Sequence, residues 1–220
     1  STYSNLLAEY TVNYKKTHSQ TLLPMLDEIA NMTELDLTTI DAIAIAAGPG
    51  SFTGLRIGSA TAKGLGLALK KPLISIPTVD ALAYNLYGTD RLICPIMDAR
   101  RNQVYAAFYM WENGKLIRLT DHMAESIERV IEIAEMLEHE VIFLGDGVPV
   151  HRERLEQNPA FLFAPAHCNM QRASAVAALG AIMAEEGLAK PGNAFELIYL
   201  RKSQAERERE ARLAKEEAGE

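Results

Sequence analysis

Short apolar runs alternate with amphipathic stretches along most of the chain. Residues 42–46 and 73–76 are brief and continuously apolar, which is typical of strands covered on both faces in a parallel sheet. Residues 51–69 and 79–87 follow them with helical spacing of apolar positions. Residues 6–14 alternate apolar and polar positions loosely, as an edge or half-buried strand does. This rhythm of strands and helices predicts an α/β half-sheet.

A further helix is predicted ahead of the first buried strand. Thr17 and Gln20 have the spacing of a capping box. Pro24 argues against a start much before Thr21, because proline is tolerated only in the first turn of a helix. Four apolar residues then share one helix face: Leu22, Leu26, Ile29 and Ala30.

The remaining elements predict a second α/β unit. Asn113–Gly114 is a strong signal for a two-residue hairpin turn. The predicted strands are 92–97, 104–111, 115–119 and 141–144, and the predicted helices are 127–137 and 173–187. No Ser/Gly-rich linker separates the units, so we expect two domains packed directly together. Their expected ranges are 1–90 and 91–190, followed by a C-terminal segment and charged tail, 191–220.

Composition and charge narrow the class of protein. The chain is 48% hydrophobic and 23% charged, which is ordinary for a globular protein. No apolar run approaches the roughly 18 residues of a membrane span, and the first residues lack the pattern of a secretory signal. Cys94 and Cys168 cannot form a disulfide framework. We therefore expect a soluble protein of the reducing cytoplasm, without a membrane partner.

The acidic balance of the chain argues against autonomous binding of nucleic acid. The formal net charge is -7 and the pI is about 5.3, so the protein repels polyanions as a whole. The densest basic stretch, residues 201–215, interleaves Glu with Arg. This pattern favours a solvated helix with ion pairs four residues apart.

The helix predicted over residues 51–69 contains four glycines, although each interior glycine costs about 0.5–1 kcal/mol relative to alanine. Gly54, Gly58, Ala62 and Gly66 recur at every fourth residue. They therefore form a ridge of missing side chains along one face, where another backbone can approach closely. Either the protein's own sheet or first helix covers this ridge, or a helix of another subunit does. Spacing alone favours the internal arrangement.

The turn at residues 48–51 lies between a buried strand and a helix N-terminus, where free backbone N–H groups can hold an anion. It is neither a P-loop nor a nucleophile elbow, because both motifs are absent. A tight turn with Ser51 as the helix N-cap is the favoured interpretation. Asp98 ends another predicted strand and could be catalytic or bind Mg²⁺, but an ion pair of Asp98 with Arg100 or Arg101 that pins the hairpin is favoured.

Four segments together resemble the TsaB (YeaZ) family. They are AIAAGPGSFTGLRIG (44–58), THSQTLLPMLDEI (17–29), DARRNQVYAAFY (98–109) and LIYLRKSQAERE (197–208). The GPGSFTGLRIG run is highly specific, and the similarity extends over nearly the whole chain. The resemblance implies two α/β domains of the actin-like, Hsp70-like and sugar-kinase-like (ribonuclease H-like) fold.

The resemblance also implies a function and a surface. TsaB is the non-catalytic dimerisation and activating subunit for TsaD in N6-threonylcarbamoyladenosine modification of ANN-decoding tRNAs. Its first two helices, here 17–32 and 51–69, dock the equivalent helices of TsaD. This shifts the interpretation of the glycine ridge to partner docking. The implied docking residues are His18, Leu22, Leu26, Ile29, Gly54, Leu55, Gly58, Ala62, Leu65 and Gly66.

Partners and cofactors follow from the same resemblance. It implies a heterodimer with TsaD, the TsaE ATPase as a further partner, a homodimer in isolation, and tRNA only as substrate of the complex. It implies no cofactor on this chain alone and ATP or ADP at the boundary with TsaD. Two turns could face phosphate in an actin-like fold; their residues are Gly48, Gly50, Ser51, Gly145, Asp146 and Gly147. Taken alone, the second is a common turn.

The resemblance predicts no catalytic or metal-binding residue. Two histidines of TsaD ligate metal, and the matching positions here are Thr78 and Leu82, which cannot replace imidazole. The five histidines of this chain include no pair four residues apart and no HExxH motif. His18 is interpreted as a helix-start or interface residue. The alternatives are a nucleotide-dependent ATPase or kinase and, with less support, a glycoprotease-like metallopeptidase.

Family members begin with a buried strand and a phosphate loop upstream of what is Ser1 here. A parallel sheet that lacks this inner strand would leave unpaired backbone groups. We therefore expect the native protein to carry about twenty further residues before Ser1, judged from ordinary strand and turn lengths.

Overall fold

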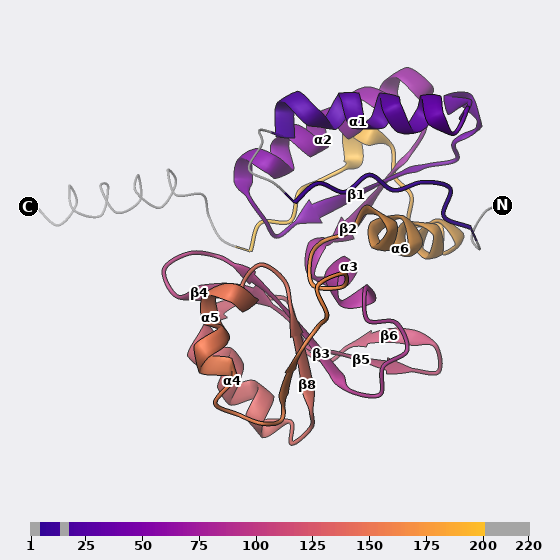
Figure 1. The fold of residues 1–220 in the computed structure, drawn as a ribbon. Coiled ribbons are helices and arrows are strands. Elements are labelled where there is room, and N and C mark those ends of the chain that lie inside the picture. Colours follow the sequence, from indigo (N-terminus) through magenta and orange to yellow (C-terminus); the bar gives the residue numbers. More distant parts are fainter. Residues whose placement is uncertain (1–4, 14–17, 201–220) are drawn as a thin grey trace, which may run out of the picture.

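The computed structural model describes residues 5–13 and 18–200, and of residues 18–20 it describes the backbone alone. A two-stranded sheet and a seven-stranded sheet organise this part of the chain. Figure 1 shows them in two units, with helices α1 and α2 on the outer side of the first unit. Among the described residues, no helix is both long and apolar enough to cross a membrane.

The sheet of the first unit lies between two helices that approach its backbone closely. Strands β1 (Ile43–Gly48) and β2 (Leu73–Pro77) pair in parallel. A Cβ added at Gly58 of α2 (Phe52–Leu69) would lie 3.6 Å from Ile45. A Cβ at Gly180 of α6 (Ala173–Glu185) would lie 2.5 Å from the Cβ of Ala44. Since successive strand residues point to opposite faces, α2 covers one face and α6 the other.

Strand β1 is less buried than its apolar sequence predicts. Residues 43–46 are half-buried, whereas Leu73, Ile74 and Ile76 of β2 are buried. β1 pairs with β2 along one edge, and no described strand pairs with its other edge. Residues 5–13 form no strand, so the predicted strand is wrong over the described part of 6–14. A β-strand is defined by its hydrogen bonds to a neighbouring strand, and the loose alternation of residues 6–14 does not provide one.

Helix α6 and the residues that follow it pack on the first unit, although helix 173–187 is predicted to belong to the second. Val176, Leu179 and Met183 pack against a buried cluster that includes Ile74 and Ile76. The chain then continues through a short 3₁₀ turn, Gly192–Ala194, and its buried Phe195 joins another cluster of this unit. The first unit is therefore assembled from both ends of the chain.

The sheet of the second unit is centred on β3 (Leu92–Asp98), whose residues 92–97 are buried. β8 (Val141–Leu144) pairs with it in parallel on one edge. β4 (Gln103–Ala106) and β5 (Tyr109–Glu112) pair with it antiparallel and keep a single register, Ile96↔Ala106 and Ile93↔Tyr109. They are therefore two halves of the strand predicted over 104–111. The strand is interrupted where the N–H of Phe108 donates to Thr120 Oγ1, 3.0 Å away.

The predicted hairpin turn is confirmed, because Asn113 and Gly114 both have positive φ and join β5 to β6 (Lys115–Arg118). The other elements are α1 (His18–Met32), the 3₁₀ turn Leu37–Thr39, α3 (Thr78–Tyr84), β7 (Met123–Ser126), α4 (Ile127–Met136), α5 (Val148–Leu155) and β9 (Phe161–Phe163). β7, α5 and β9 were not predicted. α1 begins at His18 with Pro24 inside it, three residues before the start that proline favoured; the predicted cap residue Thr17 lies outside the described residues.

Candidate docking surface

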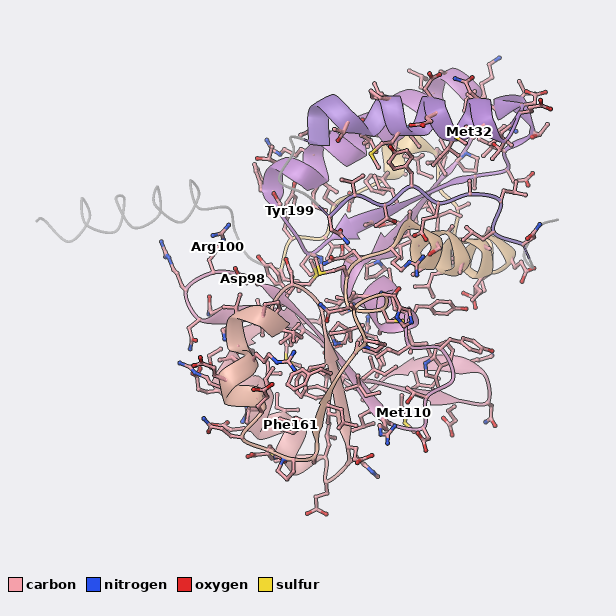
Figure 2. All side chains as sticks on the ribbon, in the orientation of Figure 1. Met32, Asp98, Arg100, Met110, Phe161 and Tyr199 are labelled. Atoms are coloured by element: carbon pink, nitrogen blue, oxygen red, sulfur yellow. The ribbon has the colours of Figure 1, made fainter. Side chains whose placement is uncertain are left out.

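Helices α1 and α2 pack side by side on the outer face of the first unit (Figure 1). Leu22 and Ile29 of α1 are half-buried, as residues facing α2 should be. Leu23 is 56% exposed, Leu26 39% and Met32 80%. Figure 2 shows Met32 at the C-terminal end of α1. Leu23 and Leu26 therefore share an exposed apolar face of α1, whereas Met32 lies on the opposite side of the helix; nothing is described for the side chain of His18.

The glycine ridge of α2 faces inward over most of its length. Ala62 is 5% exposed and Gly66 is buried. A Cβ added at Gly66 would lie 3.0 Å from both Leu73 Cδ2 and the Lys71 carbonyl oxygen. Together with the approach of Gly58 to Ile45, this shows that the protein's own sheet lies against the ridge. The assignment of Gly58, Ala62 and Gly66 to partner docking is corrected, because close helix–sheet packing explains these small residues.

Three other predicted docking residues lie at the borders of this face. Gly54 is half-buried, and a Cβ added there would meet the side chain of Ser51 at 3.5 Å. Leu55 is also half-buried and points toward the turn, since its Cδ1 would lie 3.3 Å from a Cβ at Gly48. Leu65 is half-buried. These positions are accessible only in part.

A second small-residue stripe of α2 faces solvent. Ala60, Gly64 and Ala68 recur at every fourth residue and are exposed, and a Cβ added at Gly64 meets nothing within 4 Å. Leu67 beside them is 82% exposed. Sequence reasoning missed this stripe, but Arg56 lies on the same helix face and signals solvent there. We call the exposed residues Leu23, Leu26, Ala60, Gly64, Leu67 and Ala68 the docking surface.

The chain's own C-terminal segment closes the turn at residues 48–51. Gly48 has φ +117°, and a Cβ there would lie 2.3 Å from the carbonyl oxygen of Ile198. The N–H of Ile198 donates to the carbonyl of Ala47, 2.8 Å away. Ser51 is the N-cap of α2, as predicted, and accepts from the N–H of Gly54. A glycine is needed at position 48 because the backbone of Ile198 lies against it. The turn is therefore not open to an anion.

The glycine N–H groups of the turn at residues 145–147 are also hydrogen-bonded within the protein. Gly145 donates to the carbonyl of Asn169, 2.8 Å away, and Gly147 to that of Ile96, 3.0 Å away. Asp146 Oδ1 accepts from the N–H of Asp98. Desolvation raises the pKa of the Asp146 carboxyl, and the nearby Asp98 charge raises it further, against the lowering effect of that hydrogen bond. The turn holds two strand ends together and leaves neither glycine N–H for a phosphate.

The loop after Asp98 is pinned by backbone hydrogen bonds more than by the predicted ion pair. Asp98 Oδ1 accepts from the N–H of Arg100 at 2.8 Å. The Arg100 side chain is 88% exposed, and its Nε lies 3.9 Å from Asp98 Oδ2. Asn102 then donates to both carboxylate oxygens of Glu128 at 2.8 and 2.9 Å, which ties the loop to α4.

The two positions that the family resemblance matches to metal-binding histidines are part of the core. Leu82 is fully buried, and Thr78 is 7% exposed with its Oγ1 unpartnered. His122 Nε2 lies 2.6 Å from Asp80 Oδ1, and His151 is buried against β3. Among the described residues, no three histidine, cysteine or carboxylate side chains gather as metal ligands would.

Two α/β units of this topology define an actin-like, ribonuclease H-like protein. Residues 5–208 match the model of the TsaD family, described as tRNA N6-adenosine threonylcarbamoyltransferase. The chain therefore belongs to this family, and within it to the TsaB, or YeaZ, group.

Similar proteins support both the assignment to this family and the assignment to the TsaB group. The tRNA threonylcarbamoyladenosine biosynthesis protein TsaB of Bacillus subtilis is 34% identical over 69% of this chain and 66% of its own length. Its namesake in Escherichia coli is 36% identical over 60% of this chain and 58% of its own. The chain thus spans about two thirds or less of these curated relatives. A solved Pseudomonas aeruginosa structure, titled as an uncharacterized protein with similarity to peptidase YEAZ, has a TM-score of 0.72 and 26% identity, with 84% of this chain and 85% of that one covered.

Proposed function

We propose that this chain is a non-catalytic subunit that docks and activates TsaD during N6-threonylcarbamoyladenosine modification of ANN-decoding tRNAs in the cytoplasm. The names of the TsaB relatives support the pathway. The docking surface supports the role, and it is the observation that carries the proposal. It combines exposed Leu23, Leu26 and Leu67 with a stripe of small residues on α2.

The shape of the docking surface suits a pair of helices from a partner. Small residues at every fourth position let a second helix approach the backbone of α2 closely. The flanking leucines then supply the apolar area whose burial stabilises association, about 25 cal/mol per Å² before the entropic cost of binding. Large contiguous apolar patches on a protein mark interaction sites more often than scattered residues do.

Several features support a role without chemistry. Thr78 and Leu82 lie in the core where TsaD carries metal ligands. The N–H groups of Gly145 and Gly147 bond to the protein's own carbonyls, which gives the kinase-type alternative no open phosphate cradle there. The proposal includes ATP or ADP at the boundary with TsaD, TsaE as a further partner, and tRNA as substrate of the complex.

Matched helix-surface variants test the proposal. Ala60→Arg and Gly64→Arg place a long cation on the docking surface, whereas Ala177→Arg places one on exposed α6. In calorimetric titrations with TsaD of the same organism, we expect the first two to abolish binding and the third to leave it unchanged. Self-association in isolation should follow the same pattern, with TsaD displacing the second copy. Circular dichroism and thermal melting verify that all three variants fold.

Reconstitution measures the activity itself. TsaD and its remaining partners should modify tRNA with the wild-type chain and fail without it. Full modification in its absence, or TsaD binding by both docking-surface variants, contradicts the proposal. Calorimetry that shows millimolar ATP binding to this chain alone would favour the nucleotide-dependent alternative.

A further inference from the structure

Arg56 lies at the edge of the docking surface, four residues before Ala60. Its guanidinium carbon is 3.9 Å from the centre of the Phe52 ring. That ring packs in turn against Tyr199, with 5.7 Å between ring centres, where the last described residues reach the first turn of α2 (Figure 2). A guanidinium stacked on a ring keeps its planar face occupied and its N–H edge free. Arg56 is therefore held in place with its donors available.

Arg56 has no anionic partner within the described residues. Most arginines there do have one, as Arg91 pairs with Glu140 at 2.7 Å and Arg152 with Glu156 at 2.6 Å. No carboxylate of the described part lies within ion-pair distance of Arg56. Its neighbours along the exposed face are Ala60 and Gly64, which offer no charge, and Lys63, a further cation seven residues on. Arg56 is thus a positioned cation without a carboxylate partner at the edge of the docking surface.

We propose that Arg56 receives a carboxylate from the partner that docks on α1 and α2, and that this ion pair sets the orientation of docking. The inference rests on the proposed function. When a partner covers the apolar stripe, Arg56 loses water, and a guanidinium that stays charged at any working pH then needs an anion. A carboxylate matches its fork with two parallel hydrogen bonds.

The surroundings favour a protein carboxylate over a nucleic-acid phosphate. A site for polyanions needs several cations along one track. Lys63 and Lys70 are also exposed along α2, but Arg56 borders an apolar stripe and the chain of net charge -7 repels a polyanion as a whole. Charged groups at the rim of an apolar interface add specificity and speed association. Arg56 is placed to do this for the docking surface.

The test compares Arg56→Ala, Arg56→Lys and Arg56→Glu in titrations with purified TsaD at low and high salt. We expect Arg56→Ala to weaken binding about tenfold and reduce its salt dependence, and Arg56→Glu to weaken it about a hundredfold. Arg56→Lys keeps the charge without the fork and should fall between Arg56→Ala and wild type. Lys115→Glu is the control, because Lys115 is an exposed cation on β6 of the second unit. It should stay within about twofold of wild type, since it lies away from the docking surface.

A charge swap identifies the carboxylate. Single Asp→Lys and Glu→Lys variants of the docking helices of TsaD, titrated against Arg56→Glu, should include one that restores binding. Normal binding and salt dependence in Arg56→Glu would overturn the inference while leaving the docking proposal intact. Normal TsaD binding with loss of tRNA from the complex would assign Arg56 to RNA and overturn it as well. Failure of the wild-type chain to bind TsaD would overturn both.

Discussion

The two sheets of the molecule differ in how completely their central strands are paired and buried. The central strand β3 of the second unit has strands on both edges and is buried over residues 92–97. The strand β1 of the first unit is half-buried over residues 43–46 and has one described strand neighbour. The first unit also carries the docking surface. The comparison indicates that the second unit buries its central strand completely, with α3 joining one of its buried clusters, whereas the first unit leaves part of β1 and of the helices α1 and α2 exposed.

The largest expected effect separates the core of the second unit from the docking surface. Phe143 is fully buried and packs edge-on against Phe161, with 5.1 Å between ring centres. Phe143→Ala should cost about 3–5 kcal/mol of unfolding free energy through lost burial and a cavity. Leu67→Ala should change it by less than about 0.5 kcal/mol, because that side chain is exposed. Urea unfolding measures both, and similar losses would break the comparison.

A glycine pair on α2 sharpens the distinction between its two faces. Gly64→Ala should stabilise the protein by about 0.5–1 kcal/mol, because alanine favours the helix and its Cβ meets open space. Gly66→Ala should instead destabilise it by about 1–3 kcal/mol, since the new Cβ crowds Leu73 and the Lys71 carbonyl. Thermal melting of the two variants gives the signs. Equal gains in both would mean that the inward face is not tightly packed.

Acid should weaken the second unit through His151. Its side chain is buried, and Nε2 has no hydrogen-bond partner in the described structure. Desolvation lowers its pKa, helped by the Arg154 charge and opposed by Asp98 and Glu128. Below the unfolded pKa of about 6.5, His151 is protonated in the unfolded chain but stays neutral in the folded one. The free energy of unfolding therefore falls as pH drops below that value.

The variant His151→Phe isolates that contribution. It should reduce the slope of unfolding free energy against pH by at most the equivalent of one proton, about 1.4 kcal/mol per pH unit. Urea unfolding between neutral pH and mild acid measures the slope. An unchanged slope in the variant would show that other groups cause the acid sensitivity.

The smallest expected effect concerns the N-terminal segment of the first unit. Glu9 accepts from the N–H and Oγ of Ser174 at 3.1 and 2.9 Å and pairs with Arg172, so it caps the start of α6. Burial alone would raise its pKa, but these hydrogen bonds lower it. The stabilisation is present above the unfolded pKa and is lost as pH falls through the lowered one.

Glu9→Gln should cost about 1 kcal/mol, as the loss of a helix cap does. It should also speed hydrogen exchange of residues 5–13 without affecting β3. Exchange measured by mass spectrometry reports both regions, and unchanged exchange of the segment would mean that Glu9 does not hold it.

Local patterns in the sequence were sufficient for several elements. The Asn113–Gly114 turn, the Ser51 cap and the strands at 73–76 and 141–144 depend on neighbouring residues, and all are present. The strand expected over residues 6–14 failed because a strand needs a ladder partner that alternation cannot supply. Likewise, β9 is three residues long and is defined by its pairing with β8.

The sequence by itself determined the family, the order of most helices and strands, and the presence of an unusually smooth helix at residues 52–69. Only the tertiary structure decided which side of that helix is free. Two stripes of small residues with the same spacing lie on α2, and spacing is blind to what packs against each. Gly58, Ala62 and Gly66 pack closely against β1 and β2. Ala60, Gly64 and Ala68 remain exposed to solvent, because a helix can bury only one face against its own sheet.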